Sequence, residues 1–198
     1  MEQVKSVVSL YTESTPNPAT MKFVVNRILL KGLTADYTNI NETEGAPFAA
    51  ALFGYNYVSG VFIKNNFVTV TKTEAKKWQE VIPEIKEFIR GFLSEEQTVF
   101  TETALEEIKE KSFVQTGDQS EIEQQIVELI QTYVQPAVEM DGGSIVFKSF
   151  DDGVVTLGMQ GACSGCPSST ITLKNGIQGL LERMLPEGTV KDVVAEEM

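Results

Sequence analysis

The sequence contains no histidine among its 198 residues. Histidine is the usual nitrogen ligand of protein metal sites and the usual general base near neutral pH, so metal binding or acid-base chemistry must use other side chains here. The sequence also lacks a catalytic triad, a P-loop and a dinucleotide-binding fingerprint. We therefore expect a protein that is not an enzyme.

Long apolar runs are absent as well. No stretch approaches the roughly 18 consecutive apolar residues that are needed to span a membrane. The first residues, M-E-Q-V-K-S, have neither the apolar core of a signal peptide nor the arginine-rich composition of a transit peptide. We expect a cytoplasmic protein without membrane contact. The alternative is an organellar protein that has already been trimmed to this form.

Positive charge is scarce in the second half of the chain. The formal net charge is −12, to which residues 120–198 contribute −8, residues 94–119 contribute −5 and residues 1–93 contribute +1. Binding of nucleic acid requires a basic face, because the ligand presents phosphates. The charge distribution therefore argues against nucleic acid as a partner of the second half.

Cysteine is rare too. The chain has two, Cys163 and Cys166, and both lie in the stretch G-A-C-S-G-C-P-S-S-T. A C-x-x-C pair brings two thiols within reach of one metal ion, one cluster edge or each other. A four-coordinate metal site or a cubane cluster needs more ligands than two thiols. Pairing of two chains is the simplest way to complete such a site; otherwise the site is open.

The residues around the cysteines indicate how the thiols are tuned. Residues 154–160 have the pattern of a strand, and Pro167 is typical of the first position of a helix. The thiols would then lie at a helix N-terminus, where exposed N–H groups favour a thiolate and an anionic cluster. Because no Lys or Arg occurs between Lys148 and Lys174, backbone amides must supply the positive potential.

Other uses of the C-x-x-C pair stay open at this point. A structural disulfide or zinc clip would add little to a domain with its own core. Thiol-disulfide exchange shares the order strand, C-x-x-C, helix, but we expect the preceding strand to belong to an antiparallel hairpin and not to a βαβ unit. An interaction adaptor would make the cysteines incidental. Asp141, in an Asp-Gly-Gly sequence before a strand, is interpreted as part of a turn and not as a ligand.

Residues 1–93 predict a first α+β domain. Strands are expected at residues 7–12 and 21–25, a short helix from Pro47, and a hairpin at 58–63 and 67–71. Thr73 is expected to cap a helix that has one apolar face. Because Pro83 lies inside the apolar pattern, we predict a kink or break near Ile82, and we predict a core position for Trp78.

Residues 94–119 are acidic and lack a regular apolar pattern, so we expect a flexible linker in which any helix is transient. Residues 120–198 predict the second domain. A capping box from Ser120 to Glu123 opens a helix, and two strands, a helix after Pro167 and a final strand follow. The predicted fold class is α+β: two small α+β domains joined by an acidic linker, the second with the order helix, strand, strand, helix, strand.

With these stretches identified, the chain resembles the Nfu family of NifU-like proteins. In the first half, the resemblance rests on T-P-N-P-A-T-M-K-F, A-P-F-A-A-A-L-F and V-F-I-K-N-N-F-V-T-V-T-K. In the second half, it rests on D-G-G (Asp141–Gly143), the cysteine stretch and L-K-N-G-I (Leu173–Ile177). The first half thus resembles the Nfu N-terminal domain, and the second half resembles the NifU C-terminal domain.

The resemblance implies an iron-sulfur cluster scaffold or carrier. Cys163 and Cys166 of two subunits would hold one 4Fe-4S cluster between them, with a 2Fe-2S cluster as the other form such a site could take. The expected partners are donor proteins of cluster assembly, client apo-proteins that receive the cluster, and a second copy of the chain when the cluster is bound.

Overall fold

The structure is a computed structural model, and it describes residues 7–114, 119–165 and 167–197. The chain divides into two compact units. The first comprises Met1–Ser14 and Pro18–Glu110, and the second comprises Thr15–Asn17 and Lys111–Met198. Each unit combines helices with its own β-sheet, which confirms the predicted α+β class.

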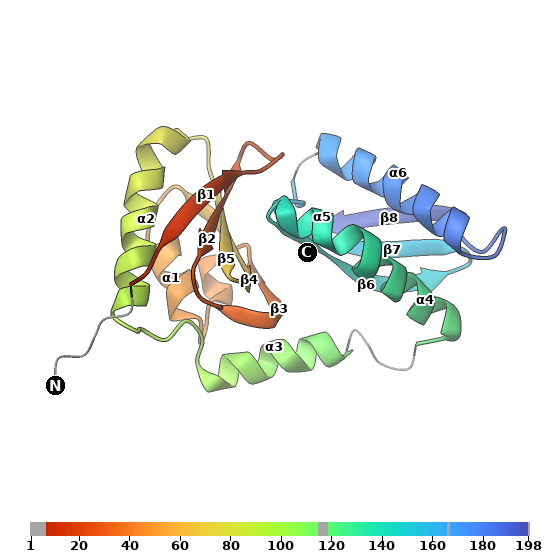
Figure 1. Ribbon diagram of the computed structural model, residues 1–198, viewed down its shortest axis with the longest axis horizontal. Helices are drawn as coiled ribbons and strands as arrows, with labels where there is room; N and C mark the ends of the chain where they lie inside the picture. The colour runs from red at the N-terminus through yellow and green to blue at the C-terminus, as the bar shows by residue number, and fades with distance from the viewer. Residues whose placement is uncertain (1–6, 115–118, 166, 198) are drawn as a thin grey trace. The chain divides into compact units, whose positions relative to one another are not determined.

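The first unit is built on a five-stranded antiparallel sheet with the order β1-β2-β5-β4-β3 (Figure 1). Its strands are β1 (Leu10–Ser14), β2 (Thr20–Val25), β3 (Leu30–Tyr37), β4 (Val58–Asn65) and β5 (Phe67–Lys72). The predicted β4-β5 hairpin is present. The sequence did not predict β3, because a register shift between Leu30 and Thr34 interrupts the alternation of this edge strand.

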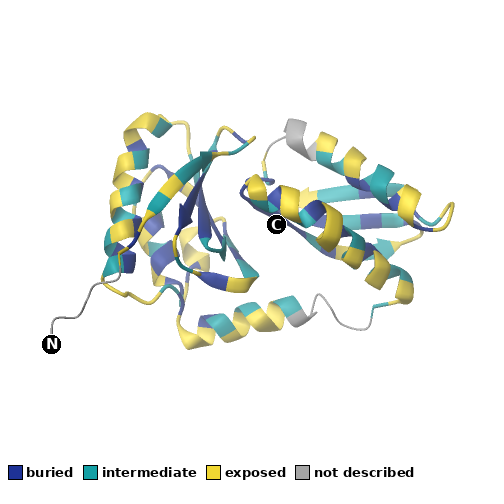
Figure 2. Cartoon of the chain, viewed as in Figure 1, coloured by how far each residue is buried: buried dark blue, intermediate teal, exposed yellow. Residues whose placement is uncertain are grey.

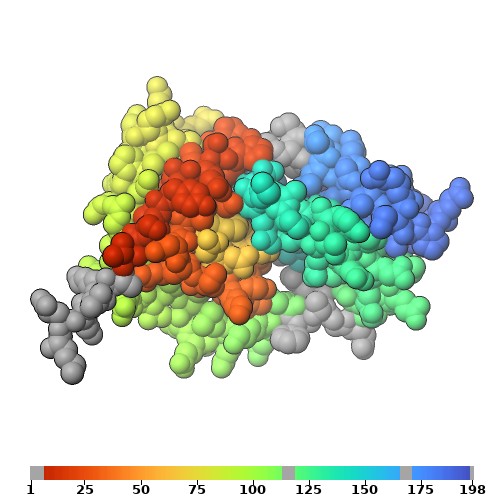
Figure 3. Space-filling model, in the orientation of Figure 1, coloured from red at the N-terminus to blue at the C-terminus, as the bar shows by residue number. Residues whose placement is uncertain are grey.

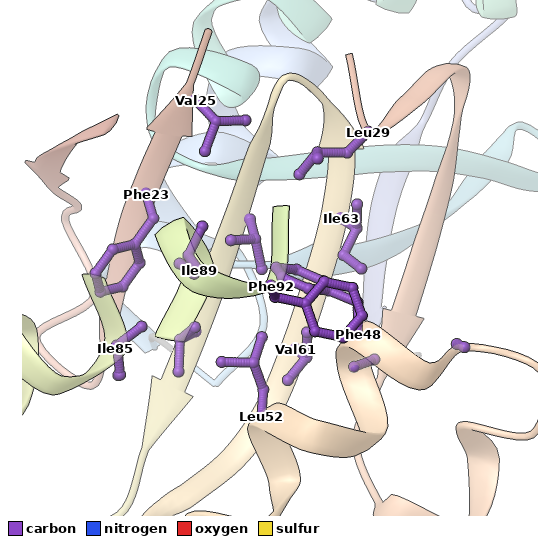
Figure 4. Packing of buried hydrophobic residues seen from close by; sticks show 14 of the residues in the cluster. Phe23, Val25, Leu29, Phe48, Leu52, Val61, Ile63, Ile85, Ile89 and Phe92 are labelled. Atoms are coloured by element: carbon purple, nitrogen blue, oxygen red, sulfur yellow. The ribbon is translucent and has the colours of Figure 1, made fainter. Parts of the chain in front are cut away.

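Helices α1 (Pro47–Phe53) and α2 (Trp78–Ser94) supply the apolar side chains that pack against the sheet, and a short 3-10 helix, η1 (Ile40–Glu42), precedes them. Figure 4 shows Phe48 and Leu52 of α1 and Ile85, Ile89 and Phe92 of α2 pointing toward the strands. Trp78 is packed against this core, as predicted, and its Nε1 donates a hydrogen bond to the Pro18 carbonyl at 2.9 Å.

Helix α2 differs from the sequence prediction at two points. It begins at Trp78 with Lys77 as the N-cap residue, so Thr73 does not cap it. It also continues through Pro83, so the helix does not break near Ile82; a kink there stays a prediction. Pro83 lies on the exposed face, and the opposite face buries Val81, Ile85 and Ile89. Packing of that face compensates for the hydrogen bond that the proline cannot make.

Helix α3 (Glu102–Val114) lies within the stretch that the sequence assigned to a linker. Phe100 and Ala104 are each 6% exposed, and Leu105 and Ile108 pack against the first core. The N–H of Thr101 also donates to the Gly45 carbonyl at 2.8 Å. The start of the helix is therefore anchored to the first unit, and fewer apolar residues suffice for this than the sequence pattern suggested.

The second unit has a three-stranded sheet with the order β6-β7-β8. Strands β6 (Gly143–Asp151) and β7 (Val154–Gly161) are antiparallel, and β8 (Asp192–Glu197) is parallel to β7. Its helices are α4 (Glu121–Leu129), the π-helical turn η2 (Ile130–Val134), α5 (Gln135–Met140) and α6 (Pro167–Met184). None of the helices in the described ranges is both long enough and apolar enough to cross a membrane.

The helical segment from Glu121 to Met140 follows the predicted start but not the predicted end. Ser120 and Glu123 form the expected capping box. The sequence predicts that the helix ends by Pro136, but the chain passes through η2 into α5, where Pro136 occupies the first turn. A proline costs little in the first turn of a helix, where its missing N–H has no intrahelical partner. Figure 2 shows buried and exposed residues in stripes along these helices.

Candidate functional site

Cys163 lies in the turn between β7 and α6 and is 8% exposed. Backbone hydrogen bonds define the turn: the N–H of Cys163 donates to the Gln160 carbonyl at 3.4 Å, and the N–H of Ser164 donates to the Gly161 carbonyl at 3.2 Å. Gly161 has φ of 62°, in the left-handed region that a residue with a side chain adopts only at a cost. The glycine thus permits the turn that presents Cys163.

A second stretch of chain, at the start of β6, supports the same turn. The N–H of Ala162 donates to the Gly142 carbonyl at 3.2 Å, and Gly142 has φ of 82°. A Cβ built on Gly143 would lie 2.5 Å from Sγ of Cys163 and 2.8 Å from the carbonyl oxygen of Gln160. Real Cβ atoms do not approach other atoms so closely, so Cys163 can occupy its position only because residue 143 is glycine.

Gln135, at the start of α5, fastens that helix to β6. Its Nε2 donates to Oε1 of Glu139 and to Oγ of Ser144, both at 2.9 Å, and its Oε1 accepts from the N–H of Ile145 at 3.3 Å. Ser144 is 2% exposed, so these hydrogen bonds are sheltered from water. The side chain therefore fixes the position of α5 relative to the strand that supports Cys163.

Cys163 also lines a groove together with residues of η2, α5 and α6. Most of the lining is apolar: Val134, Ala137, Val138, Ala162, Leu173, Ile177 and Leu180. Tyr133, which is 57% exposed, and Asp141 are the larger polar side chains there. Both Tyr133 and Val134 belong to the π-helical turn, an irregularity that often occurs at functional sites.

The lysines nearest to the cysteines in sequence are engaged in ion pairs. Nζ of Lys148 lies 2.9 Å from Oε2 of Glu196, and Nζ of Lys174 lies 3.0 Å from Oδ1 of Asp192. The hydrogen bond from Lys174 lowers the pKa of Asp192 below its usual value, and the N–H of Val193 contributes in the same direction. Both lysine charges are therefore largely balanced by carboxylates.

The structure places the sequence-predicted site residues as follows. Cys163 lies at the groove, whereas Cys166 falls outside the described residues. Asp141 ends α5, and its backbone forms part of the turn into β6, as the turn interpretation predicts. Throughout the described ranges, no three or more carboxylate or cysteine side chains gather in a way that could hold a metal ion.

The strand pairing on either side of Cys163 differs from the expectation that we used against thiol-disulfide exchange. We expected the strand before the cysteines to belong to an antiparallel hairpin and not to a βαβ unit. β7 pairs with β6 in such a hairpin, but it also pairs in parallel with β8 across α6. The turn that carries Cys163 therefore opens the crossover of a βαβ unit as well. This parallel pairing depends on a distant strand, so the local pattern around the cysteines could not indicate it.

The close approach of Gly143 to Cys163 and the groove were both missed from the sequence. The second glycine of Asp-Gly-Gly was the available signal. The left-handed φ of Gly142 explains why residue 142 is glycine, but Gly143 has no left-handed φ, so its identity needs another reason. A glycine at the start of a strand without a positive φ is a sign that another group approaches its backbone closely.

Comparison with known proteins identifies both halves of the chain. Residues 10–96 match the family model described as the N-terminal domain of the scaffold protein Nfu/NifU, and residues 126–194 match the NifU-like domain. Over 98% of its length, the chain is 38% identical to the mitochondrial NFU1 iron-sulfur cluster scaffold homolog of Drosophila willistoni. It is also 38% identical, over 94% of its length, to the mitochondrial NifU-like proteins 4 and 5 of Arabidopsis thaliana.

The aligned segments cover 66%, 65% and 67% of these three relatives, so the chain spans about two thirds of their length. The names of the relatives contradict one expectation. We predicted a cytoplasmic protein, but all three relatives are mitochondrial. The prediction is wrong because it depended on the composition of the first residues, which does not decide the compartment.

Proposed function

Since the chain belongs to the Nfu family of NifU-like proteins, we propose that it carries a 4Fe-4S cluster between two copies of the chain and passes it to apo-proteins. The ligands in this proposal are the thiolates of Cys163 and Cys166. The observation that carries it is the position of Cys163, in a glycine-supported turn before α6 and on an apolar groove.

The number of thiols supports a shared site. A cubane cluster held by cysteines takes four thiolates. The chain has two cysteines and no histidine, so two copies together supply the four thiolates. Cys163 is 8% exposed, which is consistent with a ligand at the rim of an interface. We propose that the dimer forms with the cluster and separates when the cluster leaves.

The surroundings of the thiol support release of the cluster. A cluster held by four thiolates is anionic, so nearby cations would retain it. Lys148 and Lys174 are paired with carboxylates, and within the described part of the chain no Lys or Arg lines the groove. We propose that the N–H groups at the start of α6 provide the main electrostatic stabilisation of the thiolates. Such weak stabilisation suits a carrier.

Transfer to a client is a ligand exchange in this proposal. Thiolates of the apo-protein replace Cys163 and Cys166 on the cluster irons one after another, and the released thiolates take up protons that the incoming thiols lose. No electron is transferred, and no substrate is turned over, so the protein acts as a carrier and not as an enzyme. The partners are the apo-proteins that receive the cluster, the proteins that donate it and a second copy of the chain.

Anaerobic reconstitution with iron and sulfide tests the proposal. We expect about four irons and four sulfides per two chains, a 4Fe-4S Mössbauer spectrum and a mass that doubles only when the cluster is present. About two irons and two sulfides per two chains would replace the cubane with a 2Fe-2S cluster. Absence of bound iron under these conditions would contradict the carrier role.

Two variants and one control assign the ligands. Cys163→Ser and Cys166→Ser should each lose the cluster while keeping the circular dichroism spectrum of the wild-type protein, because the core of the second unit is built mainly from aliphatic and aromatic side chains. Asp141→Asn should still bind the cluster, since the proposal gives that carboxylate no ligand role. Unfolding of either serine variant would indicate a structural metal site instead.

Thiol-disulfide exchange is the second candidate, and the parallel pairing of β7 with β8 across α6 favours it. A strand, a C-x-x-C turn, a helix and a parallel strand form the arrangement typical of redox-active cysteine pairs. Exchange would require Cys163 and Cys166 to cycle between dithiol and disulfide. A chain that binds no iron but catalyses reduction of a disulfide by a small thiol would select this candidate over the carrier.

A further inference from the structure

The first unit has a groove of its own, which the cluster chemistry does not use. It is formed by the end of α1, the residues that follow α1, the second half of α2 and the residues just after α2, and its volume is about 550 Å³. Figure 3 shows that α2, in yellow-green, lies on the molecular surface. The lining residues are Ala51, Tyr55, Glu84, Glu87, Phe88, Gly91, Phe92, Glu95 and Gln97.

The floor of this α1-α2 groove is aromatic and held firmly by the core. The ring centroid of Phe88 lies 5.8 Å from that of Phe48, 5.7 Å from that of Phe92 and 6.0 Å from that of Tyr55. Phe48 is fully buried and Phe92 is 7% exposed, whereas Phe88 and Tyr55 are half-buried. The exposed parts of these rings therefore form a preorganised apolar surface.

The rim of the groove is acidic. Three charged side chains line it in the described part of the chain, and all are glutamates: Glu84, Glu87 and Glu95. Oε2 of Glu84 accepts a hydrogen bond from the hydroxyl of Tyr57 at 2.8 Å. Oε2 of Glu87 lies 3.1 Å from Nη1 of Arg90, in an exposed ion pair that contributes little free energy. A carboxylate-rich rim thus surrounds an aromatic floor.

Burial and the carboxylate of Glu84 raise the pKa of Tyr55 above its ordinary value, in that order of importance. The same causes, together with the hydrogen bond to Glu84, raise the pKa of Tyr57. Both hydroxyls therefore stay protonated at neutral pH, and the glutamates provide the negative charge of the groove. This environment repels phosphates and carboxylates and attracts cations.

We propose that the α1-α2 groove docks a segment of a partner protein in which lysine or arginine side chains flank an apolar side chain. The basic groups would pair with Glu84, Glu87 and Glu95, and cations are also attracted to the faces of aromatic rings. The apolar side chain would cover Phe88 and Tyr55. A volume of about 550 Å³ accommodates a few side chains, not a folded domain. Because Cys163 takes no part, this proposal does not depend on the proposed cluster chemistry.

The probe is a blocked synthetic peptide of about twelve residues, with lysines around leucines that share one helical face. It is titrated into the ¹⁵N-labelled full-length apo-protein while amide shifts are recorded. We expect the largest shift changes in residues 51–55 and 84–97. A second peptide has serine in place of every leucine, so that it keeps the charge and loses the apolar face. It should bind at least about tenfold more weakly.

Gly91 offers a substitution that fills the groove. A Cβ on Gly91 meets no atom within 4 Å, so Gly91→Leu adds a side chain over open space on the helix and should keep the fold. The matched control is Gly179→Leu in α6 of the second unit, where a Cβ also meets nothing within 4 Å. We expect Gly91→Leu to weaken binding of the leucine peptide at least about tenfold and Gly179→Leu to leave it unchanged.

The charges are tested in the same way. The double variant Glu87→Gln with Glu95→Gln should weaken binding several-fold and reduce its dependence on salt concentration. The double variant Glu106→Gln with Glu110→Gln alters the net charge equally on exposed positions of α3 and should bind like the wild-type protein. These controls separate a docking site from general attraction to an acidic protein.

Three outcomes would overturn the proposal: equal binding of the serine and leucine peptides, an unchanged affinity of Gly91→Leu, or shift changes spread over acidic surface outside the groove. Cluster reconstitution of Gly91→Leu is measured in parallel and should match that of the wild-type protein. Failure of reconstitution in every variant, with peptide binding intact, would contradict the cluster proposal and leave the docking proposal supported.

Discussion

Replacement of Gly143 by alanine should disturb the cysteine turn directly. The added Cβ would lie 2.5 Å from Sγ of Cys163, 2.8 Å from the Gln160 carbonyl oxygen and 3.0 Å from the amide nitrogen of Cys163. The latter two atoms belong to the backbone, so rotation of a side chain cannot relieve the clash. Overpacking of this kind costs about 1–3 kcal/mol of unfolding free energy.

The assay is urea denaturation of the apo-protein, followed by iron incorporation during reconstitution. A loss of about 1–3 kcal/mol would lower the unfolding midpoint of the second unit measurably. Iron incorporation should fall as well, because Sγ of Cys163 must move to make room. The control is Gly179→Ala, where a Cβ meets nothing within 4 Å. It should stabilise the protein by about 0.5–1 kcal/mol, because alanine is a better helix former than glycine.

A Gly143→Ala variant that is as stable as the wild-type protein and binds as much iron would refute this prediction. That result would mean that the turn can shift by several tenths of an ångström without a cost, so that Gly143 does not position the thiol. A loss of stability with full iron incorporation would be equally informative. It would mean that Gly143 is needed for packing of the turn but not for binding of the cluster.

Three further predictions concern the stability of each unit. Ser120→Ala removes the capping box and should cost about 1 kcal/mol of unfolding free energy, measured by denaturation of the full chain; an unchanged value would show that the cap contributes nothing. Burial, and then the charge of Glu107, raise the pKa of Tyr37 to about 12, so the contribution of Tyr37 to the unfolding free energy should be fully present below pH 10 and be lost as pH rises through about 12. Denaturation at several alkaline pH values should show a shallower fall for Tyr37→Phe. A fragment of residues 120–198 should fold alone with a cooperative thermal transition, because its buried cluster runs from Ile126 to Val193; a fragment without such a transition would contradict the predicted boundary.

Much of the fold could be predicted from local patterns. The hairpin of β4 and β5 has alternating apolar residues around a short turn, and Ser120 with Glu123 is a complete capping signal. Strand β3 was not predicted, and helix α3 was assigned to a linker in which any helix is transient, since local patterns do not show the packing that both elements have. Lys31 and Gly32 interrupt the pattern of β3, yet the strand pairs with β4 along the edge of the sheet. Leu105 and Ile108 suffice to place α3 on the first core.

The sequence by itself determined the chemistry of the site. Two cysteines at C-x-x-C spacing and the absence of histidine limit the sulfur and imidazole donors to two thiols per chain, and no tertiary contact can change that number. The family also followed from local motifs, and the comparisons confirmed it.

Only the tertiary structure decided which groups surround those donors. The approach of Gly143 to Cys163 and the parallel pairing of β7 with β8 join segments that are distant in sequence. The same holds for the acidic α1-α2 groove, which requires Tyr55, after the end of α1, to meet Phe88 of α2. Such proximity arises from packing of whole elements, and periodicity along the chain reports only which face of an element is buried.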